Sequence, residues 1–327
     1  MSQSIALLIP CYKAEKFIAD LLCEAINQSV PFNEIICYDD CSTDNTVQAI
    51  QQFSQVQLIQ SNKNKGPAYA RNCLAAASKS DFIHFHDADD SLHRDFVKEM
   101  LPYVAQWTVT YCAMKTLSYN GLTEYSQEQE AKNYNERIYQ AITSTLHLNR
   151  CIFPRNLFMK LGGFNQKLRL CEDKMFILKC NLEKVCFIYV DKILVQRIHS
   201  FHSIVGSSPW NKKVFSLVQM YEEMIDLIPR EFHQKIANQL LDVAWNLYYR
   251  NYSKQAYYAV ELAINYDRDI TFDSHKYALL SKYIGIIPTF RLLKLWSKLT
   301  GNYNFPPSLL KDRNLIIPKF VDRQNFD

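Results

Sequence analysis

The chain has 327 residues, of which 48% are hydrophobic and 21% are charged, which is typical of a globular protein with one large or two smaller domains. Its formal charge of +4 is too small to indicate a nucleic-acid partner, and no apolar stretch approaches a membrane span. The N-terminus lacks the features of a secretory signal and the ten cysteines form no CxxC pair, so we expect a cytoplasmic protein with reduced thiols.

The first quarter of the chain alternates between buried strands and amphipathic helices. Continuous apolar runs predict strands at residues 4–10, 34–40, 56–61 and 81–87, and apolar residues at helical spacing predict helices at 16–29, 44–54 and 68–78. Strands that alternate with helices in this order form a parallel, largely buried sheet with helices on its faces. The sequence therefore predicts an α/β fold.

The patterns after residue 100 are more mixed. Residues 107–119 alternate like an exposed edge strand, 126–137 favour a loop or an exposed helix, 171–184 favour a helix with an acidic start, and 184–199 favour two short strands. From about residue 209 the periodicity is entirely helical. We therefore expect an α/β domain over residues 1–208 and a helical C-terminal domain over 209–327.

A loop follows each of the four strands predicted between residues 4 and 87, and most of these loops are polar. Ligands of parallel sheets bind beyond the carboxyl ends of the strands. These loops are Pro10–Tyr12, Asp39–Ser42, Asn62–Gly66 and Asp87–Asp90. Because the carboxyl ends of parallel strands lie along one edge, we expect the four loops to converge on one rim.

The last of these loops, in the stretch FIHFHDADDSL, concentrates carboxylates at the end of a strand. Asp87 and Asp89 are two residues apart, so an extended loop would present both on the same side. Hard oxygen ligands suit Mg²⁺ or Mn²⁺, which often complete their shells with substrate phosphates. The alternative is that Asp89, Asp90 or Ser91 caps a following helix, but capping needs only one such residue. We prefer a metal and diphosphate site.

Six segments occur in an order that resembles glycosyltransferase family 2, the inverting sugar transferases of the GT-A fold. They are IALLIPCYKAEKFI, EIICYDDCSTDNT, NKNKGPAYARN, FIHFHDADD, GGFNQKLRLCEDKMF and QRIHSFHS. The resemblance covers roughly residues 3–205 and leaves the helical C-terminal region outside. It implies a mostly parallel sheet flanked by helices, to which the helical periodicity after residue 208 adds an all-helical C-terminal extension.

The resemblance implies a role for each matched residue. The nucleotide-binding positions are Pro10, Tyr12, Asp40, Lys65, Gly66 and Asp87. The metal ligands are Asp89, Asp87 and His199, for Mn²⁺ or Mg²⁺. Asp40 would read the uracil edge, although turn and capping chemistry could also explain the Asp39–Asp40 pair. Arg71 fits a nucleotide contact and a salt-bridged helix residue equally well.

The pair Glu172-Asp173 resembles the family's acidic pair, in which the aspartate is the catalytic base. Inverting displacement at an anomeric carbon needs one carboxylate to accept the proton of the acceptor hydroxyl. Both residues could merely favour a helix N-terminus, but the flanking GGF and RIH segments lead us to prefer catalysis for Asp173. Glu172, Arg197 and His202 are candidates for acceptor binding or support, and His202 competes with His199 for its role.

One departure from the family pattern lies in the loop after the second strand. Cys41 stands where the family usually has glycine, which adopts positive φ without strain. Cysteine can adopt the same backbone conformation only at a cost in free energy. The substitution puts the shape of this loop in doubt rather than the fold.

The C-terminal region contains a basic segment without counter-charges. No acidic residue lies between Ser274 and Lys311, and basic residues alternate there with large apolar ones. Such a segment favours contact with an anionic membrane surface through residues 282–300, at the inner face of the plasma membrane. A helix that packs its apolar side on the protein and shows its lysines to water explains the pattern equally well.

These features together indicate a metal-dependent inverting glycosyltransferase, with a hexose as the expected sugar. The donor would be a nucleotide sugar, with UDP as the expected nucleotide, and the acceptor a saccharide or glycolipid of lipopolysaccharide, lipooligosaccharide or capsule synthesis. A sugar nucleotidyltransferase is the enzymatic alternative, but the first loop, IPCYKAEK, lacks the glycine that it needs. A non-catalytic scaffold is the other alternative, and the joint presence of Asp87, Asp89, Asp173 and His199 argues against it.

Overall fold

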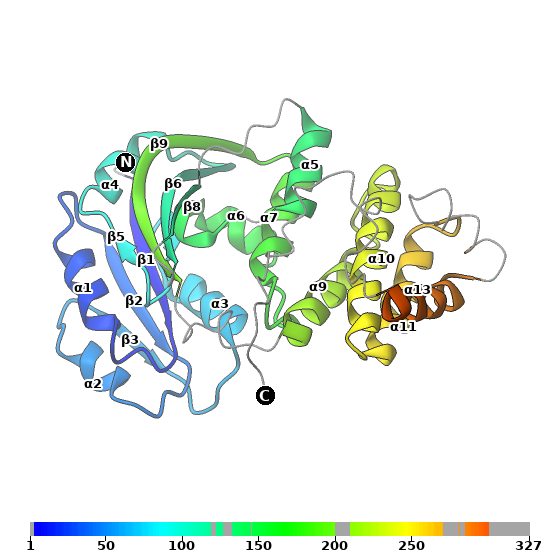
Figure 1. The fold of residues 1–327 in the computed structure, drawn as a ribbon. Helices are drawn as coiled ribbons and strands as arrows, with labels where there is room; N and C mark the ends of the chain where they lie inside the picture. Colours follow the sequence, from blue (N-terminus) through cyan, green and yellow to red (C-terminus); the bar gives the residue numbers. More distant parts are fainter. Residues whose placement is uncertain are drawn as a thin grey trace. The chain divides into compact units, whose positions relative to one another are not determined.

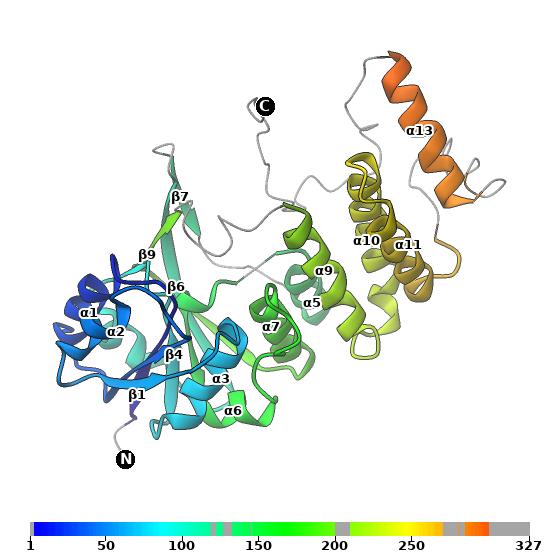
Figure 2. The same cartoon turned by 90° about the horizontal axis from the view of Figure 1, so that it is seen from below.

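The computed structural model describes residues 3–118, 122–126, 133–144, 146–199, 210–270, 281 and 285–300. The chain separates into two compact units (Figures 1 and 2). The first comprises Met1–Ala141 and Thr145–Ser208, and the second comprises Ile142–Ser144 and Pro209–Asp327.

The first unit is built on a nine-stranded sheet whose N-terminal half is parallel. The strands are β1 (Ile5–Cys11), β2 (Glu34–Asp39), β3 (Gln57–Gln60) and β4 (Phe82–Phe85), in the order β3-β2-β1-β4. All three pairings between these strands are parallel. Each of the four predicted strands is therefore present, and their carboxyl ends lie along one edge of the sheet.

The second half of the sheet mixes both strand directions. It continues through β8 (Cys151–Pro154), β6 (Thr108–Ser118), β9 (Cys186–His199) and β5 (Ser91–Leu92), with β7 (Thr123–Ser126) paired to β6. Only β6 and β9 are parallel to each other here; the other pairings in this half are antiparallel.

Two predictions about these strands are wrong. β6 is an interior strand rather than an exposed edge, because it pairs with β8 on one side and β9 on the other. Its threonines are buried, and the Thr110 hydroxyl donates to the Tyr103 carbonyl at 3.0 Å. Residues 184–199 form one long strand rather than two. The pairing with β6 jumps from Val190 to Ile193, so a bulge accommodates the polar pair Asp191-Lys192 inside one strand.

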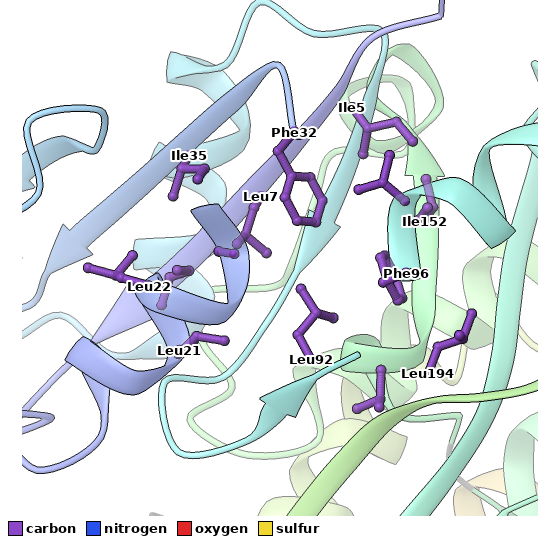
Figure 3. Close-up of a cluster of buried hydrophobic side chains, with 14 of the residues drawn as sticks. Ile5, Leu7, Leu21, Leu22, Phe32, Ile35, Leu92, Phe96, Ile152 and Leu194 are labelled. Carbon is purple, nitrogen blue, oxygen red and sulfur yellow. The ribbon is translucent and has the colours of Figure 1, made fainter. Parts of the chain in front are cut away.

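Helices cover both faces of the sheet, as the continuous apolar strands require. On one face lie α1 (Ile18–Ile26), α2 (Thr46–Gln51) and α4 (Phe96–Met100), and on the other α3 (Pro67–Ala77), α6 (Arg155–Lys160) and α7 (Glu172–Leu182). Alternate residues of β1 supply the two cores: Ile5, Leu7 and Ile9 join the first, which Figure 3 shows, and Ala6 and Leu8 join the second. α5 (Tyr134–Thr143) begins within the segment expected to be a loop or an exposed helix.

The second unit is helical in its described residues. It contains α9 (Trp210–Met224), α10 (His233–Tyr249), α11 (Ser253–Tyr266) and α13 (Ile286–Thr300). α10 and α11 pack side by side (Figure 2). Each buries small residues completely, such as Ala244 and Ala259. In the part of the chain that the structure describes, no helix is both long enough and apolar enough to span a membrane.

Candidate active site

The loops after β1 and β2 are joined directly. The backbone N–H of Lys13 donates to the Ser42 hydroxyl at 2.9 Å, and the N–H of Ala14 donates to the Thr46 hydroxyl at 2.8 Å. Cys41 adopts φ of +65°, so the position where the family usually has glycine keeps the left-handed conformation. The sequence departs from the family here, while the backbone retains the conformation that glycine favours.

Asp40 joins the second loop to the third. Its two carboxylate oxygens accept the backbone N–H groups of Lys65 at 2.8 Å and Gly66 at 2.7 Å, and only 4% of the residue is exposed. Gly66 has φ of +91°, a backbone conformation that would be strained for a residue with a side chain, and it is the N-cap residue of α3. The observed task of Asp40 is therefore to shape this loop, and its contact with a uracil edge stays a prediction.

Tyr12 and Lys65 present exposed groups at the same rim. Tyr12 follows β1 beyond Pro10, is 41% exposed, and has the Lys13 ammonium 5.5 Å from its ring centre. The Lys65 ammonium lies 4.2 Å from the ring centre of Tyr69 and donates to its hydroxyl. An open aromatic ring beside cations can stack on a flat base, as predicted for Tyr12.

The acidic loop after β4 is a turn rather than an extended segment. The N–H of Asp90 donates to the Asp87 carbonyl at 3.2 Å, which leaves Asp87 and Asp89 half-buried and turns Asp90 inward. The chain then enters β5, and the next helix, α4, begins only at Phe96 after Asp95. The alternative in which Asp89, Asp90 or Ser91 caps a following helix is therefore wrong.

Arg71 connects the acidic turn to the Glu172-Asp173 pair. From α3, its guanidinium donates to Asp87 Oδ1 through Nη2 and to Glu172 Oε1 through Nη1, both at 2.7 Å. Its side chain is 9% exposed, that of Glu172 7%, and that of Asp87 49%. Because one planar group reaches both carboxylates, residues up to 101 positions apart in the sequence meet at one site.

Burial and Arg71 shape the ionisation of these two carboxyls differently. Burial disfavours the charged form of Asp87, but the adjacent Arg71 outweighs it and holds the pKa of Asp87 below its usual value. Burial dominates at Glu172 and raises its pKa to about 7, although Arg71 opposes the shift. Asp87 is therefore ionised at neutral pH, whereas Glu172 is close to its titration midpoint.

Asp173 lies in the first turn of α7, beside Glu172. Its Oδ1 accepts the backbone N–H of Lys174 at 2.7 Å, which orients the carboxylate. Burial raises the pKa of Asp173, while that N–H and Arg71 oppose the shift. A carboxylate with a raised pKa accepts a proton more readily at neutral pH.

The GGF segment anchors the chain that leads to this helix. The Asn72 side chain, on α3, donates to the Phe164 carbonyl and accepts the Phe164 N–H, both at 2.9 Å. Gly163 has φ of +63°, and a Cβ there would lie 2.6 Å from the Asn72 side-chain oxygen. Glycine is therefore required where this loop meets α3, the helix that also carries Arg71.

The acidic turn fits a divalent cation by its charge. Burial and the neighbouring charge of Asp87 raise the pKa of Asp89, so the turn holds more negative charge than its surroundings stabilise. Within the described residues no group of three or more His, Cys, Asp or Glu side chains forms a metal site. Asp87 and Asp89 thus offer two oxygen ligands, which suits Mg²⁺ or Mn²⁺ that keep waters or bind substrate phosphates.

The structure describes only some of the site residues predicted at and after the end of β9. Arg197 lies near the acidic turn, where its charge favours ionisation of Asp87 and Asp89, and it contacts the His147 ring at 3.3 Å. The backbone of His199 pairs with Ser118 in the sheet, but its side chain lies outside the described residues, as does all of His202.

Sequence reasoning missed several contacts of this site. The Asn149 amide donates to the buried Asp90 carboxylate, and the fully buried His84 and His86 rings lie 3.2 Å apart between their facing nitrogens. Asn149 carries no motif, and only its approach to the turn in three dimensions identifies it. The alternating His84 and His86 were visible in the sequence, but their joint burial was not.

The sheet, its helices and this rim define a GT-A fold, the fold of enzymes that use nucleotide sugars. The crystal structure of Staphylococcus aureus TarS 1-349 in complex with UDP-GlcNAc superposes with a TM-score of 0.69, at 19% identity, covering 93% of each chain. Residues 6–161 match the family described as Glycosyl transferase family 2. This match covers a little under half of the chain, so it shows a similarity of this region to the family.

Two curated relatives are informative. The poly(ribitol-phosphate) beta-N-acetylglucosaminyltransferase TarS of Staphylococcus aureus is 25% identical over 189 residues, or 54% of this chain and 32% of TarS. The poly(ribitol-phosphate) beta-glucosyltransferase of Bacillus spizizenii is 36% identical over 188 residues, or 55% of this chain and 30% of that protein. The match thus spans about a third of each relative's own length.

Proposed function

We propose that this protein is an inverting glycosyltransferase that moves a sugar from a UDP-sugar to a hydroxyl of a saccharide or polyol acceptor. The observation that carries the proposal is the ion pairing of Arg71 with both Asp87 and Glu172, at 2.7 Å each. This pairing brings the acidic turn next to the pair that contains Asp173. A diphosphate and an acceptor hydroxyl can therefore be handled on two sides of one sugar.

Asp173 is the general base of the proposed reaction. It takes the proton of the acceptor hydroxyl while that oxygen bonds to the anomeric carbon, and the bond to the nucleotide diphosphate breaks on the opposite side of the sugar. The N–H of Lys174 orients the carboxylate, and burial raises its pKa toward the range in which a base is effective. The product is a glycoside of inverted configuration, and UDP leaves with the electron pair of the broken bond.

The other residues bind and position the donor in this proposal. Pro10, Tyr12 and the loop of Lys65 and Gly66, which Asp40 shapes, would hold the nucleotide. Mn²⁺ or Mg²⁺, bound by Asp87 and Asp89 with His199 as the further predicted ligand, would neutralise charge on the leaving diphosphate. Arg197 adds a positive charge at the same turn. Glu172 holds Arg71 in place and thereby supports Asp173 indirectly.

The relatives narrow the expected donor and acceptor. TarS and the Bacillus spizizenii enzyme are named for transfer of N-acetylglucosamine and glucose to poly(ribitol-phosphate), and a TarS fragment was crystallised with UDP-GlcNAc. These names favour a UDP-hexose or UDP-N-acetylhexosamine as the donor. They also favour a cell-surface polymer of the teichoic-acid kind over the lipopolysaccharide, lipooligosaccharide or capsule acceptor expected from the sequence.

Release of UDP from a set of UDP-sugars, with and without Mn²⁺, tests the proposal. We expect UDP-GlcNAc or UDP-glucose to be turned over in the presence of the metal and a suitable acceptor, and much less with EDTA. A thermal-shift measurement with the same ligands checks donor binding separately, because a ligand of the folded state raises the melting temperature. A protein that binds no UDP-sugar and releases no UDP would be a scaffold rather than an enzyme.

A further inference from the structure

The acidic turn is anchored to the fold at both ends. Before it, the backbone N–H of His86 donates to the Leu8 carbonyl of β1 at 3.1 Å. After it, the backbone N–H of Leu92 donates to the Glu24 carboxylate at 2.7 Å. Where the predicted metal ligands lie between these two anchors therefore depends on what holds the middle of the turn.

Asp90 fixes the middle of the turn. Its N–H donates to the Asp87 carbonyl at 3.2 Å, and its side chain turns inward, where the Asn149 amide donates to Oδ2 at 2.5 Å. Asp90 is 6% exposed and Asn149 is 4% exposed. A carboxylate removed from water depends on such a donor, because hydrogen bonds stabilise its charged form. The amide thus holds in place the residue next to Asp89.

Asn149 itself is held firmly by the sheet. It lies in the short 3-10 helix η2 (Leu148–Arg150), directly before β8. β8 pairs with β4 on one side and with β6 on the other, and the Arg150 Nε donates to the Cys112 carbonyl of β6 at 2.7 Å. The amide that contacts the acidic turn is therefore fixed to the central strands, whereas the turn lies outside them.

The Asn149 amide is satisfied on one side alone. In the described part of the chain, its Oδ1 is buried and has no hydrogen-bond partner. A buried polar atom without a partner costs free energy, and an apolar side chain of similar size would avoid that cost. The bond from Nδ2 to Asp90 is what favours an asparagine at this position, so any role of Asn149 is exerted through Asp90.

We propose that Asn149 is a positioning residue: through its hydrogen bond to Asp90, it holds the acidic turn in the form that presents two carboxylates to a divalent cation. These carboxylates are those of Asp87 and Asp89. The inference rests on the proposed function and adds to it a residue that does not itself bind the cation. Without the amide, Asp90 loses a buried donor, the turn rearranges, and the two ligand oxygens lose their relative position. Replacing a residue that holds metal ligands typically lowers metal affinity about ten- to a hundredfold.

The test compares Asn149→Ala with Asn181→Ala. Asn181 is a matched control, because it is also a buried asparagine whose amide donates to a carbonyl, that of Ile177 at 2.8 Å, but it lies in the last turn of α7. Electron paramagnetic resonance measures Mn²⁺ binding in the presence of UDP, and calorimetry measures UDP binding without metal. We expect the Kd of Mn²⁺ to rise about ten- to a hundredfold in Asn149→Ala. It should stay within about threefold in Asn181→Ala, as should the Kd of metal-free UDP in both variants.

An exchange of the two side chains tests the hydrogen bond itself. Asn149→Asp keeps the size of the side chain but places two carboxylates face to face, so it should weaken Mn²⁺ binding at least as much as Asn149→Ala. Adding Asp90→Asn restores one amide and one carboxylate with their positions reversed. In this exchange variant the Mn²⁺ affinity should return to within about threefold of the wild-type value. These two variants carry the test even if the alanine variant does not fold.

The outcomes separate the inference from the proposed function. If the wild-type protein binds Mn²⁺ and Asn149→Ala binds it equally well, the inference is overturned while the proposed function stands. The same holds if Asn181→Ala loses as much affinity, or if the exchange variant does not regain it, because the bond would then serve stability alone. A wild-type protein that binds no Mn²⁺ in the presence of UDP would remove the metal from the proposed function, and the inference with it.

Discussion

Arg71 has two carboxylate partners, and the fold depends on both. Its pairing with Glu172 is almost fully buried, so loss of the guanidinium would leave a carboxyl in an apolar setting without its cation. We expect Arg71→Met to lower the free energy of unfolding by about 3 kcal/mol. Because displacement of a catalytic group by about 1 Å can cost a hundredfold, turnover should fall by at least about that factor. Urea unfolding and UDP release measure the two effects.

A second substitution separates these two consequences. Without Arg71 the buried Glu172 carboxyl must take up a proton, because the guanidinium no longer opposes the effect of burial on its pKa. In Arg71→Met with Glu172→Gln a neutral amide stands there at every pH, so the part of the lost stability that this protonation costs above pH 7 should return. Turnover should not return, because Asp87 still lacks its partner and the acidic turn is no longer tied to α7. A double variant as unstable as Arg71→Met alone would show that the pair does not act through the buried charge of Glu172.

Replacement of Asp89 and replacement of Asp173 should impair different steps, namely donor binding and proton transfer. Asp173→Asn removes the proposed base and should lower turnover about 10²- to 10⁴-fold while UDP binding stays nearly intact. Asp89→Ala should instead weaken the Mn²⁺-dependent binding of UDP. Turnover assays together with calorimetric titration of UDP, with and without Mn²⁺, distinguish the two. Retention of most of the turnover by Asp173→Asn would remove it as the base.

Single residues of the site were predictable to the extent that they belong to motifs. Asp87, Asp89 and Asp173 stand in short acidic patterns, and their candidacy needed only the sequence. Arg71 was left open between two roles, because its partners lie 16 and 101 positions away along the chain.

At the level of elements, β4 and the residue that follows it carry two histidines, His84 and His86, that folding removes from water. Both rings are fully buried; the His84 Nδ1–H donates to the Cys151 carbonyl, and the facing nitrogens of His84 and His86 lie 3.2 Å apart. Burial lowers the pKa of His84 to about 3 and that of His86 to about 4. Both histidines are therefore neutral in the folded protein across the physiological range.

These lowered pKa values predict a loss of stability in mild acid. The unfolded chain binds protons on both histidines below about pH 6.5, whereas the folded chain does so only near pH 3 to 4, so stability falls as the pH falls through this window. Each histidine contributes at most about 1.4 kcal/mol per pH unit. Between pH 7 and 5, the free energy of unfolding in urea should fall more steeply for the wild-type protein than for the double variant His84→Gln/His86→Gln.

The comparison with the double variant is needed because Glu172 acts in the opposite sense. Its pKa of about 7 lies above that of an unfolded glutamate, so its contribution to stability grows as the pH falls from 7 toward 4. Glu172 is present in both proteins and cancels in the difference. Equal pH dependence of the two proteins would mean that the histidines are not buried as neutral rings.

The order of elements was more predictable than their place in the sheet. Residues 4–86 carry continuous apolar runs and helical spacing, and these local patterns gave the parallel half correctly. β6 was misplaced at an edge because a buried threonine whose hydroxyl is satisfied looks like an exposed one in sequence. β9 was divided in two because a bulge and a turn both begin with polar residues. Whether a strand lies at an edge, and whether it is continuous, depends on the strands that pair with it, and the local sequence does not contain that information.

At the scale of the whole molecule, the C-terminal unit raises the question of where the protein works. α13 buries Phe290 and Leu293, but it also leaves Leu292 47% and Leu295 56% exposed. Lys294 donates to the Tyr248 carbonyl at 3.0 Å, and the basic segment contains no acidic residue from 275 to 310. The helix thus packs on its own unit, as expected if the basic segment only completes the fold. It also exposes leucines beside positive charge, as contact with an anionic membrane surface requires.

Exposed leucines on a basic helix predict reversible binding to an anionic membrane surface. Burial of apolar side chains at the membrane surface favours binding, and each basic residue near anionic lipid adds about 1 kcal/mol to the free energy of binding. We expect the protein to float with phosphatidylglycerol vesicles at low salt and not with phosphatidylcholine vesicles. Leu292→Glu/Leu295→Glu should abolish flotation, whereas Leu227→Glu, at a residue that is 48% exposed outside α13, should not. If the wild-type protein stays unbound at low salt, α13 serves only to complete the helical unit, and the proposed membrane contact is wrong.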